Sequence, residues 1–272
     1  MGRTLAFGLR TLVMGVINVT PDSFYAGSRV QEQGAAIEKA IAFAEAGADI
    51  VDIGGMSTRP GAREISPAEE AARVIPVIEG VRRRSGVIIS VDTYRSEVAQ
   101  KALSRGADIV NDVSGLGFDQ GLADVVRKGG GYIVLMHTRG KPERMQQNAV
   151  YADVVQEVSD ELDISIARAL EAGIGYEKII LDPGIGFAKR AEHNLALLKH
   201  LPSLRAKGYP ILVGLSRKSF LGSITGLPPE DRLLPTVAAN AVTIFQGADI
   251  IRVHDVREAV ITAKVADAIK KA

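Results

Sequence analysis

Six polar residues of complementary chemistry stand where short apolar runs of the 272-residue chain end. They are two carboxylates, one amide and three basic side chains: Asp92, Asp182, Asn111, Lys218, Arg252 and His254. A carboxylate accepts hydrogen bonds from paired donors, an amide both donates and accepts, and basic groups bind anions. Alone, an aspartate after a strand is more often a helix N-cap than a catalytic group. Unrelated caps would not be expected to supply all of these chemistries, so the pattern predicts one polar site.

The segments around these residues alternate between short β-branched runs and longer amphipathic, alanine-rich stretches. The expected strands are residues 12–17, 50–53, 87–91, 109–110, 132–136, 179–181, 211–213 and 250–253. The expected helices are residues 33–46, 67–84, 96–105, 120–128, 151–172, 194–204, 233–246 and 256–270. Continuous apolar runs are typical of parallel strands that are buried on both faces. The alternation predicts an α/β fold, the (β/α)8 TIM barrel, in which the carboxyl ends of the strands meet at one mouth.

A short device recurs where helices end and supports repeated β/α units. It is Glu45-Ala-Gly-Ala-Asp49, Ser104-Arg-Gly-Ala-Asp108 and Phe245-Gln-Gly-Ala-Asp249. Glycine can end a helix in the left-handed conformation before the next strand begins. Because no serine- or glycine-rich linker divides the chain, we expect a single domain over residues 1–272, with residues 4–7 in a short hairpin that closes the bottom of the barrel. The alternative is a doubly wound open sheet, but no Gly-x-Gly-x-x-Gly phosphate loop follows the first strand.

The composition is that of an ordinary globular protein, with 46% hydrophobic and 24% charged residues. The formal net charge is +1 and the pI about 7.9, so no general field would draw the chain to nucleic acid or to a membrane surface. The absence of cysteine excludes disulfide frameworks and thiolate metal sites. The sequence shows neither a signal peptide nor a run approaching the roughly 20 apolar residues of a membrane span, which makes a cytoplasmic location the expectation.

Five segments closely resemble the signatures of the dihydropteroate synthase family. They are Asn18-Val-Thr-Pro-Asp-Ser-Phe24, Asp52-Ile-Gly-Gly-Met-Ser-Thr-Arg-Pro-Gly61, Asp182-Pro-Gly-Ile-Gly-Phe187, Ser216-Arg-Lys-Ser219 and Arg252-Val-His254. The resemblance covers essentially the whole chain, in order and at fitting intervals. It implies a pterin-binding TIM barrel, a sulfonamide target, that condenses 7,8-dihydropterin-6-ylmethyl diphosphate with 4-aminobenzoate in folate biosynthesis and releases pyrophosphate.

The resemblance also implies how the residues divide between the substrates. The pterin site would comprise Asp92, Asn111, Met136, Asp182, Phe187, Gly214, Lys218 and Arg252. Asp182 would accept from the amine and ring N–H donors of the aminopyrimidinone edge, and Lys218 would face its carbonyl and imine side. A ring that lacked one of these partners would leave a buried polar group unsatisfied, at a cost of about 1–3 kcal/mol.

The remaining implied residues bind pyrophosphate, metal and 4-aminobenzoate. Asn18, Thr58, Arg252 and His254 would hold the pyrophosphate, and Asn18 would bind Mg²⁺, which needs few protein oxygens when phosphates complete its shell. The 4-aminobenzoate site would comprise Phe24, Thr58, Arg59, Pro60, Phe187 and Ser219. The residues expected to act in catalysis are Asp92, Lys218, Arg252 and His254, which would stabilise charge as the amine displaces pyrophosphate from the exocyclic methylene.

Two positions depart from the family pattern and keep alternatives open. The family usually has an acid where Ala26 stands and a glutamate where Met56 stands. A pterin-binding methyltransferase, which moves a methyl group from a folate to a corrinoid, is one alternative, although it would not be expected to carry Ser-Thr-Arg-Pro or Ser-Arg-Lys-Ser. A non-catalytic pterin-binding barrel is the other. The expected partners are the two small-molecule substrates and, by the resemblance, a second copy of the chain in a homodimer through the later helices.

Overall fold

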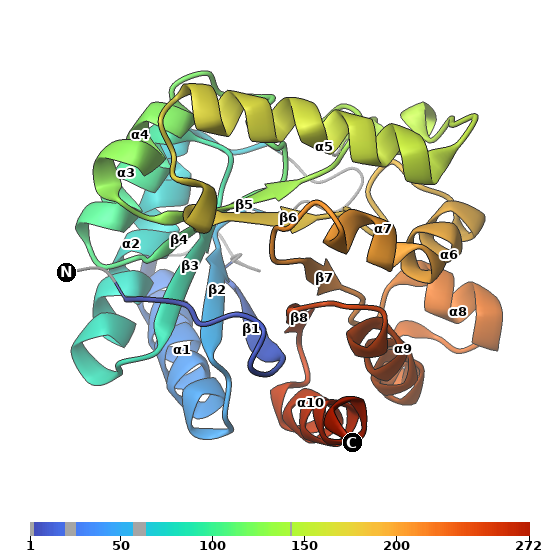
Figure 1. Cartoon of the computed structure of the whole chain (residues 1–272). Helices are drawn as coiled ribbons and strands as arrows, with labels where there is room; N and C mark the ends of the chain where they lie inside the picture. The colour runs from blue at the N-terminus through green and yellow to red at the C-terminus, as the bar shows by residue number, and fades with distance from the viewer. Residues whose placement is uncertain (1–2, 20–25, 57–63, 142) are drawn as a thin grey trace.

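Eight parallel strands form a nearly closed barrel in the computed structural model, which describes residues 3–19, 26–56, 64–141 and 143–272 (Figure 1). The strands are β1 (Leu12–Asn18), β2 (Ile50–Gly54), β3 (Ile88–Asp92), β4 (Ile109–Asp112), β5 (Tyr132–Met136), β6 (Ile179–Asp182), β7 (Leu212–Gly214) and β8 (Ile250–Val253). They are hydrogen-bonded in the order β6-β5-β4-β3-β2-β1-β8-β7. Between β6 and β7 a single parallel bridge, Leu181 to Ile211, completes the circle. The TIM-barrel prediction is therefore confirmed, and the open-sheet alternative is set aside.

The helices lie outside the barrel, between successive strands (Figure 1). They are α1 (Ala26–Glu45), α2 (Pro67–Arg84), α3 (Ser96–Ser104), α4 (Leu122–Gly129), α5 (Val154–Glu171), α6 (Ala191–Lys199), α7 (Leu201–Arg205), α8 (Ser219–Thr225), α9 (Leu233–Phe245) and α10 (Val256–Lys271). Among the described residues, no helix combines the length and the apolar character needed to cross a bilayer.

The start of α2 illustrates how local sequence sets a helix. The Ser66 hydroxyl accepts from the backbone N–H of Glu69 at 3.1 Å, and Pro67 follows at the first helical position, where its missing N–H costs nothing. Arginines at 82–84 occupy the last turn, where their positive charges interact favourably with the negative end of the helix dipole.

Side-chain alternation divides every strand between two cores. Inward residues at the amino ends of the strands fill the barrel with an apolar layer that includes Leu12, Met14, Ile50, Ile109, Tyr132, Val134, Ile180, Leu212 and Ile250. Outward residues such as Val51, Ile89 and Val213 pack beneath the helices. Because side chains alternate with a period of two, the inward set continues from Ile50 to Asp52, from Ile180 to Asp182 and from Ile250 to Arg252. The carboxyl end of the barrel is therefore lined by polar side chains.

The predicted hairpin at the amino terminus is wrong. Residues 3–11 form no strand; instead Leu5 is buried in the apolar layer at the base of the barrel, and its N–H donates to the Tyr132 hydroxyl at 3.1 Å. Both edges of β1 are already paired, one with β2 and the other with β8, so no edge remains for a hairpin partner. The segment closes the base by packing.

The predicted helix over residues 194–204 is in fact two, and one helix was not predicted. The structure has α6 and then α7, with Pro202 in the first turn of α7, where a missing N–H is tolerated. Between β7 and α9 the short α8 follows the Ser216–Ser219 segment. The three helix-ending glycines behave as expected, with φ of 98° at Gly47, 106° at Gly106 and 107° at Gly247.

Candidate active site

A buried ion cluster lies at the carboxyl end of the barrel, where β2, β3 and β8 end. The Arg252 side chain donates to Asp52 Oδ2 through Nε at 2.7 Å and to Asp92 Oδ2 through Nη2 at 2.8 Å. Asn111 Nδ2 donates to Asp52 Oδ2 at 3.1 Å. Asp52 is fully buried, whereas the Arg252 side chain keeps 24% of its exposure. The two aspartates thus fix the Arg252 guanidinium at the mouth of the barrel, where part of it stays accessible.

Burial sets the protonation of this cluster. It raises the pKa of Asp92 to about 7, against the pull of the Arg252 charge, and the neighbouring carboxylates, Asp52 first among them, add to the rise. Burial acts against the charge of Arg252, yet Asp52 and Asp92 together raise its pKa, so the guanidinium stays protonated. A carboxylate that titrates near neutrality beside a fixed cation is typical of functional sites.

A second set of polar groups comprises Asp182, which ends β6, and Lys218, which follows β7. Asp182 Oδ1 accepts from the N–H of Gly184 at 2.7 Å, which shapes the turn after β6. Burial raises the pKa of Asp182, and the charge of Lys218 opposes the rise. Lys218 donates to the Ile185 carbonyl, and its Nζ lies 5.1 Å from the centre of the Phe187 ring. Burial lowers the pKa of Lys218 to about 8, with Asp182 opposing.

An apolar wall stands beside these polar groups. Met136, at the end of β5, is buried with Tyr94 and Val113, and Phe118, Phe187 and Met56 pack against them. Met136 is in register with Asp182 on the neighbouring strand. A flat ring could therefore lie against this wall while its edge meets carboxylates. The position of Met56 explains how the chain tolerates an apolar residue there, because it joins this wall.

The other predicted residues fall at the rim or outside the described residues. Gly214 ends β7 opposite Arg252, and a Cβ there would lie 3.6 Å from the Arg252 Cβ. His254 is exposed, with Nδ1 3.0 Å from the Ser216 hydroxyl. Asn18 ends β1 and Ser219 begins α8, and both are exposed. The residues Phe24, Thr58, Arg59 and Pro60 lie outside the described residues, as does the side chain of Ala26.

The sequence did not predict a role for Asp52, which the structure places in the ion cluster. Asp52 lay inside a quoted motif, yet no role was expected for it, because it stands within the apolar run of β2. The structure makes it the shared acceptor of Arg252 and Asn111. A detectable signal was its position two residues after Ile50, on the inward face of the barrel, where an unpaired carboxylate would be costly.

The described residues contain no group of three or more histidine, cysteine or acidic side chains arranged to hold a metal ion. Asn18, an exposed amide at the end of β1, is compatible with a magnesium site, because Mg²⁺ is commonly held by one or two protein oxygens together with substrate phosphates and waters.

Known proteins resemble this chain over nearly its whole length. A family model described as "Pterin binding enzyme" matches residues 14–254. The dihydropteroate synthase of Synechocystis is 46% identical and aligns with 99% of this chain and 94% of its own. A Xanthomonas albilineans dihydropteroate synthase solved with 4-aminobenzoic acid is 42% identical, with a TM-score of 0.90 over 97% of this chain and 94% of that one. The Yersinia pestis enzyme in a sulfonamide drug complex is 41% identical, with a TM-score of 0.93 over 100% of this chain and 99% of that one.

Proposed function

This chain belongs to the dihydropteroate synthase family and is a transferase that joins a pterin-methyl group to 4-aminobenzoate, and on that premise we propose how its barrel mouth divides the work. The methyltransferase and the non-catalytic barrel are set aside, because the relatives that match over the full length are synthases. Folate biosynthesis is the pathway that this activity serves.

Asp182 and Asn111 are proposed to read the edge of the pterin ring, with Asp92 accepting a further N–H. Asp182 uses Oδ1 for the Gly184 N–H, so a ring donor would meet Oδ2. Asn111 commits one amide hydrogen to Asp52, which fixes its orientation and leaves its oxygen and second hydrogen for the ring. Met136 and Phe187 would flank the ring faces, and Gly214 would leave room beside Arg252.

Arg252 and His254 are proposed to bind the pyrophosphate, together with Thr58. Arg252 stays charged between Asp52 and Asp92 and faces the mouth, which suits it to an anionic leaving group. Asn18 would offer its side-chain oxygen to Mg²⁺, which when bound would neutralise part of the pyrophosphate charge. Lys218, with its pKa of about 8, would support the ring's carbonyl side from the β7 end.

The second substrate is proposed to enter beside Phe187 and Ser219. The relative from Xanthomonas albilineans contains 4-aminobenzoic acid, and the Yersinia pestis relative binds a sulfonamide drug. We extend both ligands to this chain and expect them to compete for one site. The remaining proposed contacts, Phe24, Thr58, Arg59 and Pro60, belong to segments outside the described residues.

The chemical step is a displacement at the exocyclic methylene carbon. The 4-aminobenzoate nitrogen forms a bond to that carbon, the carbon–oxygen bond breaks, and pyrophosphate leaves with the electron pair. Arg252 would stabilise the charge that grows on the leaving oxygen, and the ionised carboxylates Asp92 and Asp182 would stabilise positive charge that spreads into the dihydropterin ring. The nitrogen then releases one proton to solvent, so no covalent enzyme intermediate is required.

The observation that carries this assignment is the Arg252 cluster at the mouth of a pterin-binding barrel. The test is pyrophosphate release from dihydropterin-methyl diphosphate, measured with and without 4-aminobenzoate and with and without Mg²⁺. Release that requires both supports the proposed division of labour. Release that proceeds at the same rate after the divalent cation is chelated would remove Asn18 and Mg²⁺ from the proposal and leave the transferase assignment intact.

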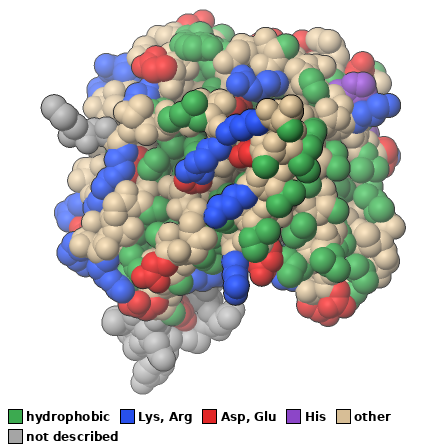
Figure 2. All heavy atoms as spheres, turned by 60° about the horizontal axis from the view of Figure 1, so that its bottom comes forward, with side chains coloured by type: hydrophobic (Ala, Val, Ile, Leu, Met, Phe, Trp, Pro, Cys, Tyr) green, Lys and Arg blue, Asp and Glu red, His purple; other side chains and the backbone are tan. Residues whose placement is uncertain are grey.

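A homodimer through the late helices is proposed on the basis of an exposed apolar face. Six large hydrophobic residues of α9 and α10 are at least half exposed: Leu234, Val242, Phe245, Ile261, Val265 and Ile269. Figure 2 shows hydrophobic side chains gathered on the right-hand side of the molecule; in Figure 1, α8 and α9 lie on that side and α10 lies below them. Burying such a face against a second copy would remove it from water.

Sedimentation velocity tests the dimer. Val265→Glu should shift the protein to monomers, whereas the control Ile164→Glu, on α5 and similarly exposed, should not. A monomeric wild-type protein at micromolar concentration would refute the proposal. The cytoplasmic location stays a prediction, and cell fractionation tests it.

A further inference from the structure

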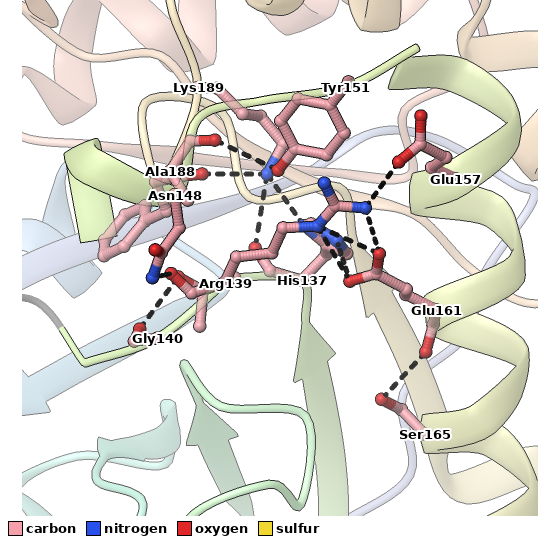
Figure 3. A network of polar contacts seen from close by, with 12 residues as sticks. His137, Arg139, Gly140, Asn148, Tyr151, Glu157, Glu161, Ser165, Ala188 and Lys189 are labelled. Atoms are coloured by element: carbon pink, nitrogen blue, oxygen red, sulfur yellow. Dashed lines mark hydrogen bonds and ion pairs between the residues drawn. The ribbon is translucent and has the colours of Figure 1, made fainter. Parts of the chain in front are cut away.

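A fully enclosed lysine stands behind the pterin site, outside the set of residues discussed so far. Lys189 follows the loop after β6 and is only 3% exposed. Its Nζ donates to the Phe187 carbonyl at 2.9 Å and lies 2.9 Å from His137 Nδ1 and 3.4 Å from the His137 carbonyl. Figure 3 shows these contacts converging on one nitrogen. The lysine therefore connects the loop after β6 to the end of β5 from a buried position.

The contacts continue outward to α5. A lysine ammonium can only donate, so His137 Nδ1 accepts from it and His137 Nε2 carries the proton that faces Glu161 Oε2 at 3.0 Å. Burial lowers the pKa of His137 to about 4, with Glu161 opposing, which keeps the ring neutral in this arrangement. Arg139 in turn binds Glu161 and, at 2.7 Å, Glu157 (Figure 3). The neutral imidazole thus separates the buried cation from the carboxylates at the surface.

The backbone beside Lys189 is held in an unfavourable conformation. Ala188 has φ of 48°, in the left-handed region that non-glycine residues seldom adopt, and it is completely buried. Its carbonyl accepts from the Tyr151 hydroxyl at 3.0 Å. Nearby, a Cβ on Gly184 would lie 1.9 Å from the His137 carbonyl oxygen, so the loop is pressed against β5. Such a conformation persists only where surrounding contacts enforce it.

The same loop begins with Asp182 and is held from the other side by Lys218. Lys218 donates to the Ile185 carbonyl, whereas Lys189 holds the Phe187 carbonyl. The positive charge of Lys189 also favours the ionised form of Asp182, as do the charges of Lys218 and Arg252. Lys218 is accessible from the mouth, but Lys189 is not, so any influence of Lys189 on the substrate must act through the loop and through Asp182.

We propose that Lys189 is a positioning residue for pterin recognition, which fixes the loop after β6 and supplies a buried positive charge behind Asp182. The proposal rests on the proposed role of Asp182 as the ring-reading carboxylate. Burial lowers the pKa of Lys189 to about 7, with Asp182 opposing, so the lysine carries its charge in the acidic range where Asp182 would titrate. The other charged groups that act on Lys189 are Lys218, Glu161 and Arg139.

Three variants separate charge from packing. Lys189→Met removes both the charge and the donors, Lys189→Gln keeps amide donors but removes the charge, and Tyr151→Phe releases the Ala188 carbonyl while leaving the charge. The matched control is Lys207→Met, which breaks the ion pair with Asp163, at 2.6 Å, on the outer surface of the barrel. The probe is 6-hydroxymethylpterin, which carries no pyrophosphate, titrated by calorimetry between pH 5 and 9.

Lys189→Met should weaken pterin binding by about 10- to 100-fold at pH 6, where Lys189 carries its charge. In both Lys189 variants the acidic loss of affinity should move upward by roughly one pH unit, because Asp182 protonates more readily without the neighbouring charge. Tyr151→Phe should change affinity by less than about threefold without a shift of the pH profile. Because Lys189→Gln keeps donors for the loop, it should fold even where Lys189→Met does not.

A pH profile of Lys189→Gln that superimposes on those of wild type and Lys207→Met would overturn the proposal and leave Lys189 as a packing residue, whatever its effect on melting temperature. Asp182→Asn distinguishes that outcome from failure of the underlying premise. If Asp182→Asn abolishes pterin binding while the Lys189 variants bind normally, only the present inference fails. If Asp182→Asn binds normally, the role of Asp182 fails and this inference fails with it.

Discussion

The two ends of the barrel use carboxylates in opposite ways. At the amino ends of the strands, Asp49 Oδ2 accepts from the backbone N–H of Val13 at 2.9 Å and from the Arg10 guanidinium at 2.8 Å. Asp108 and Asp249 repeat the arrangement, each accepting from a neighbouring strand's N–H and pairing with an arginine. These aspartates end the Gly-Ala-Asp device, and their partners are backbone groups that no ligand could replace.

At the carboxyl ends the carboxylates share a partner. Asp52 and Asp92 both bind Arg252, and Asp52 Oδ1 is buried without a hydrogen-bond partner among the described residues. At the amino ends the carboxylates bind backbone groups and arginines and hold the strands together, whereas at the carboxyl ends Asp52 keeps one oxygen without a hydrogen bond from the described residues. Similar residues at the two ends of the same strands therefore predict different mutational outcomes, stability at one end and recognition at the other.

Arg252→Ala should produce the largest effect. The two carboxylates lose their common cation and the substrate loses an anion-binding group, so kcat/KM should fall about 1,000-fold, or about 4 kcal/mol. Melting temperature should fall too, because Asp52 stays buried and loses its counter-charge. The double variant with Asp52→Asn should recover part of the melting temperature but none of the rate. Steady-state kinetics and calorimetry on the same samples check both; recovery of rate in the double variant would contradict the anion-binding role.

Asp182→Asn should weaken pterin binding by about 2–4 kcal/mol, roughly 30- to 1,000-fold. The asparagine oxygen can still accept from Gly184, but its NH₂ group faces a ring donor where a carboxylate oxygen stood. Melting temperature should hold or rise slightly, since a buried carboxylate is itself costly. Calorimetric titration with a pterin and a thermal melt decide the matter. Normal binding with a large fall in melting temperature would make Asp182 a turn residue like the aspartates at the opposite end.

Acidification from pH 8 to pH 6 should lower kcat/KM about tenfold. The pKa of Asp92 is about 7, so its ionised fraction at pH 6 is about one tenth of that at pH 8. Its stability contribution has the opposite sign. A carboxyl whose folded pKa lies above its unfolded value destabilises the fold when ionised, so stability rises as the pH falls from about 7 toward the unfolded pKa of about 4. Kinetics and urea unfolding of wild type against Asp92→Asn isolate this group. A pH-independent stability difference between the two proteins would refute the assigned pKa.

Asp108→Ala, at the opposite end, should leave kcat/KM within about twofold of wild type. It removes the acceptor of the Ile89 N–H and the ion-pair partner of Arg82, so the free energy of unfolding should fall by about 2 kcal/mol and the melting temperature by about 4–8 °C. Asp124→Ala serves as control, because the Asp124 side chain is exposed on α4 and pairs with Arg127 and Lys128 of the same helix. A tenfold loss of activity in Asp108→Ala would erase the functional distinction between the two ends.

The strands could be predicted from sequence because burial on both faces leaves a continuous apolar signature. Tyr132–Met136 and Ile250–Val253 agree with the structure to the residue. The short α8 left no comparable signal, since Gly222 lies within it and glycine disfavours helices. That glycine makes room for Arg232, whose Nη2 would lie 2.3 Å from a Cβ there. A contact from another segment, invisible to local pattern, sets this helix.

The candidate site divides in the same way. Asp182 and Arg252 were identified because motifs contained them, and Asn111 was identified because it ends an apolar run. Asp52 and Lys189 were not, since their partners are distant along the chain: Arg252 lies 200 residues from Asp52, and His137 lies 52 residues from Lys189. An acid inside a strand and a lysine in a loop look ordinary until the barrel brings their partners beside them. The sequence therefore indicates the groups proposed to contact substrate better than the groups that hold them in place.

The contact between β6 and β7 is the least extensive strand pairing in the barrel. Every other neighbouring pair of strands is registered over three to five residues, but here Leu181 and Ile211 make a single bridge, supported by one bond from the Leu181 N–H to the Pro210 carbonyl at 2.9 Å. The proposed pterin contacts stand on both sides of this pairing, Asp182 at the end of β6 and Lys218 after β7. A bound pterin would then connect the two strands where the barrel wall has the fewest hydrogen bonds. Amide hydrogen exchange of residues 179–182 and 211–214 should therefore slow when pterin binds, because the ligand would oppose local opening of the barrel between these two strands.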